Sequence, residues 1–221
     1  MNTERRAPLD RRRVAATALE LLNETGLHGL TLRAIAKELD VKAPALYWHF
    51  KDKQALLDEM ATEMYRRMVA GADLDPADTW QERLLKSNRG LRTALLGYRD
   101  GAKVFSGSSF TGIEHAEQME DNLHLFTTAG FTLSQAVRAT TTTYAYTLGF
   151  VTEEQGPKPD LDGRTHLLTD FPLSAAAGKE IFANYEGHFE EGLQLVIAGV
   201  EVTYLGARGT ARSTPTGPRF E

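Results

Sequence analysis

The chain has 221 residues, of which 42% are hydrophobic and 25% charged, a balance that is ordinary for a globular protein with a substantial core. It has no cysteine, which excludes disulfides and thiolate metal sites, and no apolar run approaches the roughly 20 residues that span a membrane. The net charge of −5 is uneven: residues 1–67 hold 12 Lys/Arg against 10 Asp/Glu, whereas residues 68–221 hold 13 against 20. The N-terminal segment is therefore the one suited to nucleic acid, and with no apolar signal segment at its start we expect a cytoplasmic protein.

Three short helices are predicted at the N-terminus. Asp10 has the side chain of a helix N-cap, apolar residues then recur at helical spacing, and Gly26 is a natural stop. Thr31 caps a second helix, which ends before a turn at residues 40–41. Pro44 stands near the start of a third helix, where its missing N–H costs nothing. Two short helices joined by a tight turn are typical of a helix-turn-helix, whose second helix enters the major groove of DNA.

The residue pattern of the third helix also predicts which side of that helix faces DNA. Leu46 and Phe50 take the inward positions, which leaves residues 47–49, Tyr-Trp-His, to point outward. The alternative is that these aromatic side chains belong to the core, as aromatics at helical spacing often do. An arginine-rich stretch precedes the motif and is either a solvated tail or a set of phosphate contacts. Its members are Arg5, Arg6, Arg11, Arg12 and Arg13.

The rest of the chain also has helical patterns, and no alternating strand pattern of any length occurs. Helices are predicted over 51–70, from Thr79 or Asp78 to about 98, over about 113–129, over about 132–151 and over 176–205, with a long loop over 155–175. We therefore predict an all-α protein. Its predicted parts are a helix-turn-helix DNA-binding domain at 1–52, a connecting helix at 53–72, a ligand-binding and dimerisation domain at 73–205 and a flexible tail at 206–221.

Several longer segments carry a family resemblance. They are ALELLNETGLHGLT, LRAIAKEL and LYWHFKDKQALLDEMATEM in the N-terminal part, and TALLGYRDGAKV, AGFTL, YTLGFVTEEQ and EEGLQLVIAGVE in the remainder. Over roughly residues 9–205 the chain resembles the tetracycline repressor (TetR) family, and its tetracycline-responsive branch closely. The resemblance implies a homodimer that grips a palindromic DNA operator, pairs through an intersubunit four-helix bundle and is released by a small-molecule inducer.

The resemblance also implies roles for individual residues in reading DNA. Arg33 matches the base-reading arginine of the family, and an arginine can donate two hydrogen bonds to the O6 and N7 atoms of guanine. Ala43 and Ala45 stand where the tetracycline-responsive branch has glutamine and threonine, so we expect a different operator sequence. Family positions that touch thymine methyls, sugars or phosphates correspond to Pro44, Tyr47, Trp48, His49 and Lys53.

The implied ligand pocket departs from the tetracycline-responsive branch. There a histidine just after the RDGAKV segment ligates the magnesium of the drug chelate, and here that position is Phe105. A phenyl ring cannot ligate magnesium, so we predict an apolar cavity for a flat, partly polar organic molecule, with no metal and no cofactor. The other predicted ligand contacts are Val69, Ser87, Leu91, Asn122, Thr140, Tyr144 and Glu153.

Some of these assignments have alternatives. The threonine run at 140–143 either faces the pocket or only bonds back to its own helix backbone. A ligand-independent or architectural DNA-binding dimer would need a core without a cavity. An enzyme is disfavoured, because the sequence has no nucleophile elbow, phosphate loop or plausible triad. The six histidines lack zinc-ligand spacing.

Overall fold

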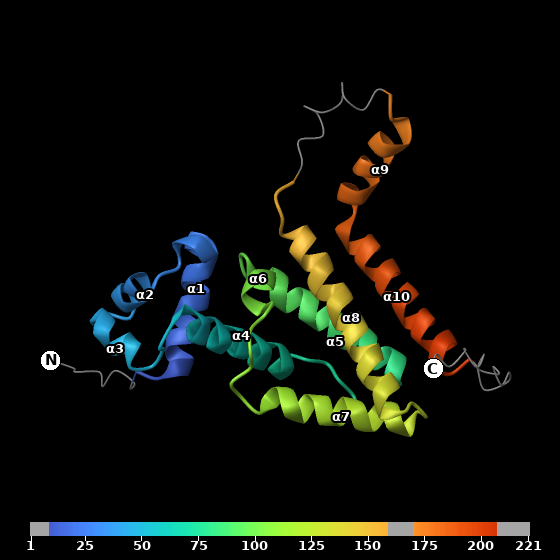
Figure 1. Cartoon of the computed structure of the whole chain (residues 1–221), viewed down its shortest axis with the longest axis horizontal. Helices are drawn as coiled ribbons and strands as arrows, with labels where there is room; N and C mark the ends of the chain where they lie inside the picture. Colours follow the sequence, from blue (N-terminus) through green and yellow to red (C-terminus); the bar gives the residue numbers. More distant parts are fainter. Residues whose placement is uncertain (1–8, 159–169, 207–221) are drawn as a thin grey trace, which may run out of the picture.

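The computed structural model describes residues 9–158 and 170–206, and all regular structure in these residues is helical (Figure 1). Three helices form a small domain at one end, and a long helix leads from it into a larger helical body. The predicted all-α fold is thus confirmed. Within the described ranges, no helix combines the length and the apolar character needed to cross a membrane. Arg5, Arg6, most of the predicted loop and the predicted tail beyond residue 206 lie outside the described residues.

The N-terminal domain consists of α1 (Arg11–Gly29), α2 (Leu32–Glu38) and α3 (Ala43–Tyr47). The Asp10 side chain caps α1 by accepting a hydrogen bond from the backbone N–H of Arg13 at 2.7 Å. Gly26 has φ 68° and ψ 173°, so the regular helix ends there and a short turn continues to residue 29. The sequence therefore predicted the start of α1 and the interruption at Gly26, whereas α1 itself continues to Gly29.

A fully buried apolar core holds the three helices together. The Thr31 hydroxyl caps α2 through the backbone N–H of Ala34 at 3.1 Å, and Asp40 takes a left-handed conformation (φ 52°) in the turn before α3. Leu46 and Phe50 are fully buried, as predicted, and they fix the side of α3 that faces the domain. Other fully buried members are Val14, Ala15, Ala18, Leu19, Leu22 and Ile35.

Two long helices form the junction with the helical body. Helix α4 (Lys53–Ala70) begins at the N-terminal domain, and its Met60 and Met64 side chains join the same core as α1. Helix α5 (Trp80–Leu96) begins with a reciprocal capping box between Thr79 and Glu82. Both helices contact α6, so the N-terminal domain and the body share one continuous core.

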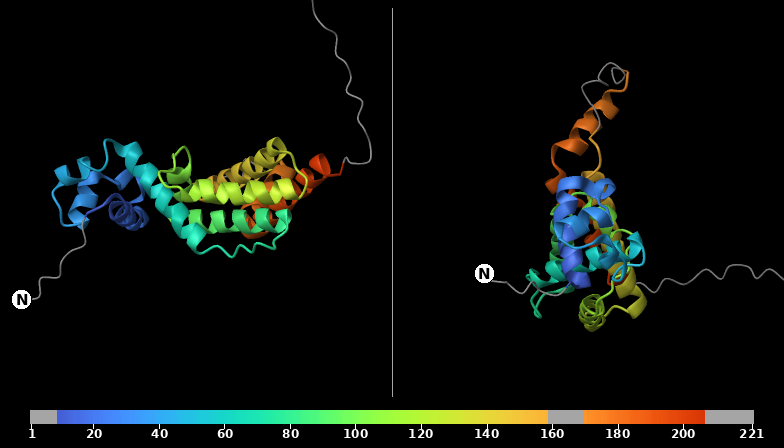
Figure 2. Two further views of the ribbon diagram at one scale, coloured as in Figure 1. Left: turned by 90° about the horizontal axis from the view of Figure 1, so that it is seen from below. Right: turned by 90° about the vertical axis from the view of Figure 1, so that its left-hand side faces the viewer.

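The helical body is completed by α6 (Gly101–Phe105), α7 (Glu114–Thr128) and α8 (Leu133–Glu154). Helix α7 lies along α5 and α8, which is clearest in the left view of Figure 2. A second core cluster joins α5, α7, α8 and α10. Its members are Trp80, Leu84, Phe126, Phe131, Ala136, Ala139, Phe189, Leu193, Ile197 and Val200.

The C-terminal part differs from the sequence prediction. The loop was expected to reach residue 175, but α9 (Pro172–Ala183) begins earlier, with the proline in the first turn where it is tolerated. The single helical region expected after it is broken at Asn184, whose extended backbone and side-chain cap start α10 (Tyr185–Tyr204). Helix α9 has no buried residue and projects away from the body, whereas α10 packs beside α8 (Figure 1).

Candidate DNA interface and ligand cavity

Helix α3 presents its aromatic residues to solvent. The side of α3 opposite Leu46 carries Tyr47 at 58% and Trp48 at 90% exposure, so these rings are not part of the core. Arg33 on α2 is exposed on the same small domain. Little of the described part of the chain covers this tryptophan, which suits a surface that docks on a larger partner.

The other predicted DNA contacts have mixed surroundings. Pro44 is exposed, whereas Ala43, Ala45 and His49 are half-buried. Lys53 is exposed, and its Nζ atom donates to the backbone carbonyl of Leu27 at 3.3 Å. Lys53 thus stabilises the end of α1 whether or not a phosphate is also present.

Two of the N-terminal arginines are engaged within the protein. The sequence placed Arg11 and Arg12 either in a solvated tail or at phosphate contacts. In the structure their guanidinium groups form ion pairs with Glu59 and Glu63 on α4, each at 3.0 Å. Both carboxylates are buried. These arginines therefore hold α1 against α4. The alternative of a solvated tail is wrong for them, whereas phosphate contact stays a prediction.

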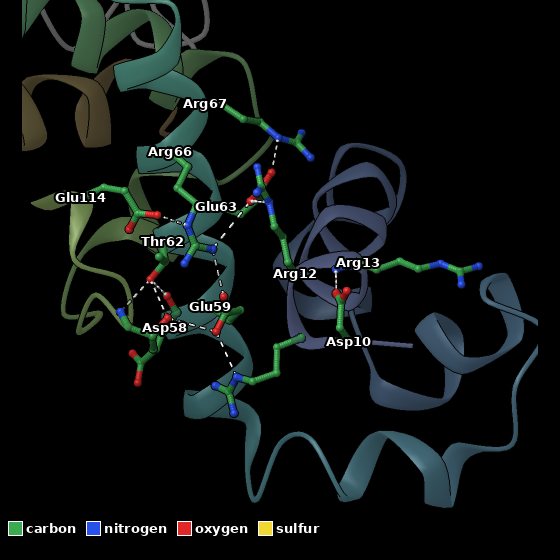
Figure 3. A network of polar contacts seen from close by, with 12 residues as sticks. Asp10, Arg12, Arg13, Asp58, Glu59, Thr62, Glu63, Arg66, Arg67 and Glu114 are labelled. Carbon is green, nitrogen blue, oxygen red and sulfur yellow. Dashed lines mark hydrogen bonds and ion pairs between the residues drawn. The ribbon is translucent and has the colours of Figure 1, made fainter. Parts of the chain in front are cut away.

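Glu59 is the centre of the polar network in Figure 3. Its carboxylate accepts hydrogen bonds from Arg11 at 3.0 Å, Arg66 at 3.1 Å and the Thr111 hydroxyl at 3.0 Å. Burial raises the pKa of Glu59, but these three hydrogen bonds outweigh it and hold the pKa below its ordinary value. Arg11 also donates to the backbone carbonyl of His49 at 2.6 Å, immediately after α3. One buried carboxylate thus connects the end of α3, α4 and the segment that precedes α7.

A second contact between the two parts of the chain lies at the turn between α5 and α6. The Asp100 carboxylate accepts the backbone N–H of Leu27 at 3.0 Å, and Asn23 accepts the backbone N–H of Arg99 at 2.7 Å. The hydrogen bond from Lys103, together with that from Leu27, holds the pKa of Asp100 below its ordinary value. The segment retained from the family pattern therefore attaches α1 directly to the body.

A cavity of about 940 Å³ lies in the body, lined by residues of α4, α5, α6, α7 and α8 and of the segments between them. Its size is within the range of small-molecule sites. The structure excludes Glu153 from the cavity wall, because that side chain is exposed near the end of α8. Its predicted ligand contact is therefore not supported within this chain. The other seven predicted ligand residues line the cavity: Val69, Ser87, Leu91, Phe105, Asn122, Thr140 and Tyr144.

One end of the cavity is an aromatic cluster. Phe105 contacts Phe110 edge-to-face at 5.2 Å between ring centroids, and Phe110 stacks on His115 at 4.7 Å. Tyr65 lies 5.0 Å from Phe110, and burial raises the pKa of its hydroxyl to about 12. Burial also lowers the pKa of His115, which favours the neutral imidazole. Phe105 is thus a packed wall residue of an apolar end.

The threonine run combines the two roles that the sequence left open. Thr140, Thr141 and Thr143 line the cavity, and each hydroxyl also donates to a backbone carbonyl one turn earlier in α8, at 3.0, 2.7 and 3.1 Å. Their hydroxyl protons are therefore used within the helix, which leaves oxygen lone pairs and methyl groups for a ligand.

Many cavity residues were missed by the sequence reasoning, and three of the polar ones matter most for recognition. Arg83 and Gln118 line the cavity beside Asn122, and His115 lines its aromatic end. A helical-spacing argument would have found the first, because residue 83 lies one turn before Ser87 on α5. No group of three or more His, Asp or Glu side chains with metal-binding geometry occurs among the described residues.

An exposed helix-turn-helix joined by buried contacts to a helical body with a ligand-sized cavity defines a class of ligand-responsive DNA-binding proteins. Two family models match the chain: "Bacterial regulatory proteins, tetR family" over residues 15–60 and "Tetracyclin repressor-like, C-terminal domain" over residues 72–204. The chain belongs to the TetR family of transcriptional regulators.

Individual relatives agree with this assignment. The tetracycline repressor protein class A from transposon 1721 of Escherichia coli is 38% identical over 195 residues, which are 85% of this chain and 88% of the relative. Among solved structures, a TetR variant from Acinetobacter baumannii in complex with minocycline has a TM-score of 0.71 and 33% identity, covering 89% of this chain and 99% of the other. BioQ with its natural double-stranded DNA operator has a TM-score of 0.63 and 31% identity, covering 87% and 98%.

Proposed function

We propose that this chain is a transcriptional repressor that binds a palindromic operator as a homodimer and is released when a small molecule enters the cavity. The observation that carries the proposal is the cavity of about 940 Å³ whose walls are bonded to the DNA-binding domain. A ligand-blind architectural dimer, the alternative function, gives no reason for such a space. Cytoplasmic location and the absence of catalysis belong to the same proposal, in keeping with the family of regulators.

The DNA-binding part extends over residues 1–52 and the connecting helix over 53–72, with the remainder to 205 as the ligand-binding and dimerisation part. The exposed rings of Tyr47 and Trp48 support docking of α3 on DNA, with Arg33 reading a base from α2. The complex of BioQ with its operator, at 31% identity, makes duplex DNA the natural partner.

The release mechanism follows from the two connections between body and DNA-binding domain. Phe110 and His115 line the cavity and flank Thr111, whose hydroxyl donates to Glu59. Tyr98 also lines it and lies beside the turn that Asp100 bonds to α1. A ligand that displaces these walls shifts α1 and α4 together, and with them the position of α3 in each subunit.

The inducer differs from a magnesium chelate of tetracycline. Phe105 stands at the position where the resemblance implies a metal-ligating histidine, and it is packed against Phe110. Its surroundings are apolar and aromatic, which suits a flat organic molecule without a metal ion.

The exposed faces of α8 and α10 support the homodimer. These two helices pack side by side, and α10 carries outward-facing apolar side chains, including Leu195 at 74% and Val202 at 71% exposure. Gly149 and Gly199 are exposed on the same helices, with open space beside each, so a second pair of helices could approach closely. Two copies of this face form the proposed four-helix bundle.

Charges on this face should separate the subunits. Leu193 on α10 is fully buried in the subunit core, so its replacement would test folding instead. We expect the double variant Leu195→Glu and Val202→Glu to sediment as a monomer where the wild type sediments as a dimer. Because a palindrome needs two recognition helices, the monomer should also lose the symmetric operator footprint.

The matched control is Ile113→Glu, a replacement of an exposed apolar residue that precedes α7. It should remain dimeric and keep the footprint. A dimeric Leu195→Glu, Val202→Glu variant, or a wild-type monomer, would overturn the proposed interface.

A further inference from the structure

Arg83 is a buried cation on the cavity wall. It lies in the first turns of α5, is 7% exposed and lines the cavity beside Asn122. Among the described residues, two hydrogen bonds occupy its guanidinium: Nη1 to the Asn122 side-chain oxygen at 3.3 Å, and Nη2 to the backbone carbonyl of Asp75 at 3.0 Å. Its Nε atom is buried without an acceptor there. A guanidinium has five N–H donors, so these two acceptors leave most of the donors of Arg83 without a hydrogen bond among the described residues.

The nearest carboxylate, that of Asp78, does not supply the missing hydrogen-bond acceptors of Arg83. Asp78 Oδ2 lies 3.9 Å from Arg83 Nε, which is too long for a hydrogen bond. Both oxygens of Asp78 are already engaged, one by Lys86 at 2.6 Å and the other by the backbone N–H of Asp75 at 2.9 Å. Asp78 therefore stabilises Lys86 more than Arg83.

The residues around Arg83 are also rich in donors. The side-chain oxygen of Asn122 accepts from both Arg83 and Gln118, so its amide N–H groups remain for a ligand. The described lining residues include three basic side chains, Arg67, Arg83 and Lys86, against a single acid, Asp73, which is exposed. Arg67 is paired with Glu63 at 3.0 Å and Lys86 with Asp78 at 2.6 Å. Of these three cations, Arg83 is therefore the one without a hydrogen-bonded carboxylate among the described residues.

We propose that Arg83 and Asn122 form an acid-recognising end of the cavity, and that the inducer carries a carboxylate or comparable anion there. Its aromatic part fills the opposite, ring-lined end at Phe105, Phe110 and His115. A carboxylate supplies the acceptors that the guanidinium lacks, in a charge-assisted and potentially bidentate pair. This inference rests on the proposed function of the cavity and specifies the chemical class of its ligand.

The test compares two probes of the same shape, anthracene-2-carboxylate and anthracene-2-carboxamide, by isothermal titration calorimetry with the full-length protein. The wild type should bind the acid about 10-fold or more tightly than the amide, as expected for a hydrogen bond to a charged group. Arg83→Met should abolish this preference while leaving the amide affinity within about 2-fold, since the amide depends on shape. Unchanged amide binding shows that the variant cavity is folded. Arg83→Lys should keep part of the preference.

The matched control is Arg89→Met, on the same helix but paired with Glu190 at the surface and outside the cavity lining. It should keep the full preference. Equal binding of acid and amide by the wild type, a preserved preference in Arg83→Met, or no binding of either probe would each overturn the inference. Binding of the acid that depends on Arg83 but leaves a bound operator in place would instead confirm the recognition site and contradict ligand-driven release.

Discussion

Replacement of Glu59 by leucine will lower the free energy of unfolding by about 3 kcal/mol, the scale for removing one member of a buried ionic network. The carboxylate is 5% exposed and accepts hydrogen bonds from Arg11, Arg66 and Thr111, all of which lose their acceptor in the variant. The measurement is urea unfolding at one fixed protein concentration, because dimer stability depends on concentration. The matched control, Glu120→Leu, removes an exposed carboxylate paired with His124 and should cost less than about 1 kcal/mol.

The stability that is lost in Glu59→Leu should depend on pH in a defined way. Hydrogen bonds hold the pKa of Glu59 below its ordinary value of 4.5 despite burial. A depressed folded-state pKa contributes stability that is present above 4.5 and lost as pH falls through the folded-state pKa. The stability difference between wild type and Glu59→Leu should therefore be constant near neutrality and shrink below about pH 4.5. A difference that grows in acid would show that the carboxylate is held in its protonated form.

If Arg33 reads a guanine through two hydrogen bonds, as we propose, Arg33→Ala will weaken operator binding by about 1–3 kcal/mol. Arg33 is exposed on α2, so the substitution should leave the fold unchanged. Fluorescence anisotropy with operator DNA and with a scrambled duplex of equal length separates base reading from phosphate attraction. The loss should be confined to the operator.

Lys53→Ala provides the contrast. If Lys53 contacts a phosphate, its loss should weaken both duplexes alike and flatten the salt dependence. Because Lys53 also donates to the carbonyl of Leu27, a melting curve of the variant must accompany the measurement. Equal losses on both duplexes for Arg33→Ala would contradict its role as a base reader.

The sequence predicted the features of the fold that depend on local chemistry. Caps at Asp10, Thr31 and Thr79 bond to backbone groups three residues away, so their chemistry is visible in a short window. The inward positions of Leu46 and Phe50 follow from helical spacing alone. Family resemblance then located seven cavity residues, since it fixes positions relative to a known pocket.

The long-range contacts could not be predicted in this way. Arg11 and Glu59 are 48 residues apart in sequence, and nothing local distinguishes an arginine that binds DNA from one that pairs with a buried acid. Arg83 acquires its role from the position of α7, which brings Asn122 beside it. The break at Asn184, by contrast, has a local signal that was overlooked, because the asparagine side chain caps α10 through the backbone N–H of Gly187.

The most direct test of ligand-driven release blocks the cavity without disturbing the fold. Gly90 lines the cavity from α5, and a Cβ atom added there meets no other atom within 4 Å. Gly90→Phe therefore places a ring inside the cavity, where it competes with a ligand for space, and the loss of the glycine also favours the helix. Leu96→Phe, on the same helix but outside the cavity lining, adds a ring without filling the cavity and serves as the control.

The measurement is operator release followed by fluorescence anisotropy in EDTA, with compounds that raise the melting temperature of the wild type in a thermal-shift screen. We expect release from the wild type and from Leu96→Phe without magnesium, and no release from Gly90→Phe, which should still bind the operator. Release that persists in Gly90→Phe would contradict the account, because the signal would then enter the protein elsewhere than the cavity.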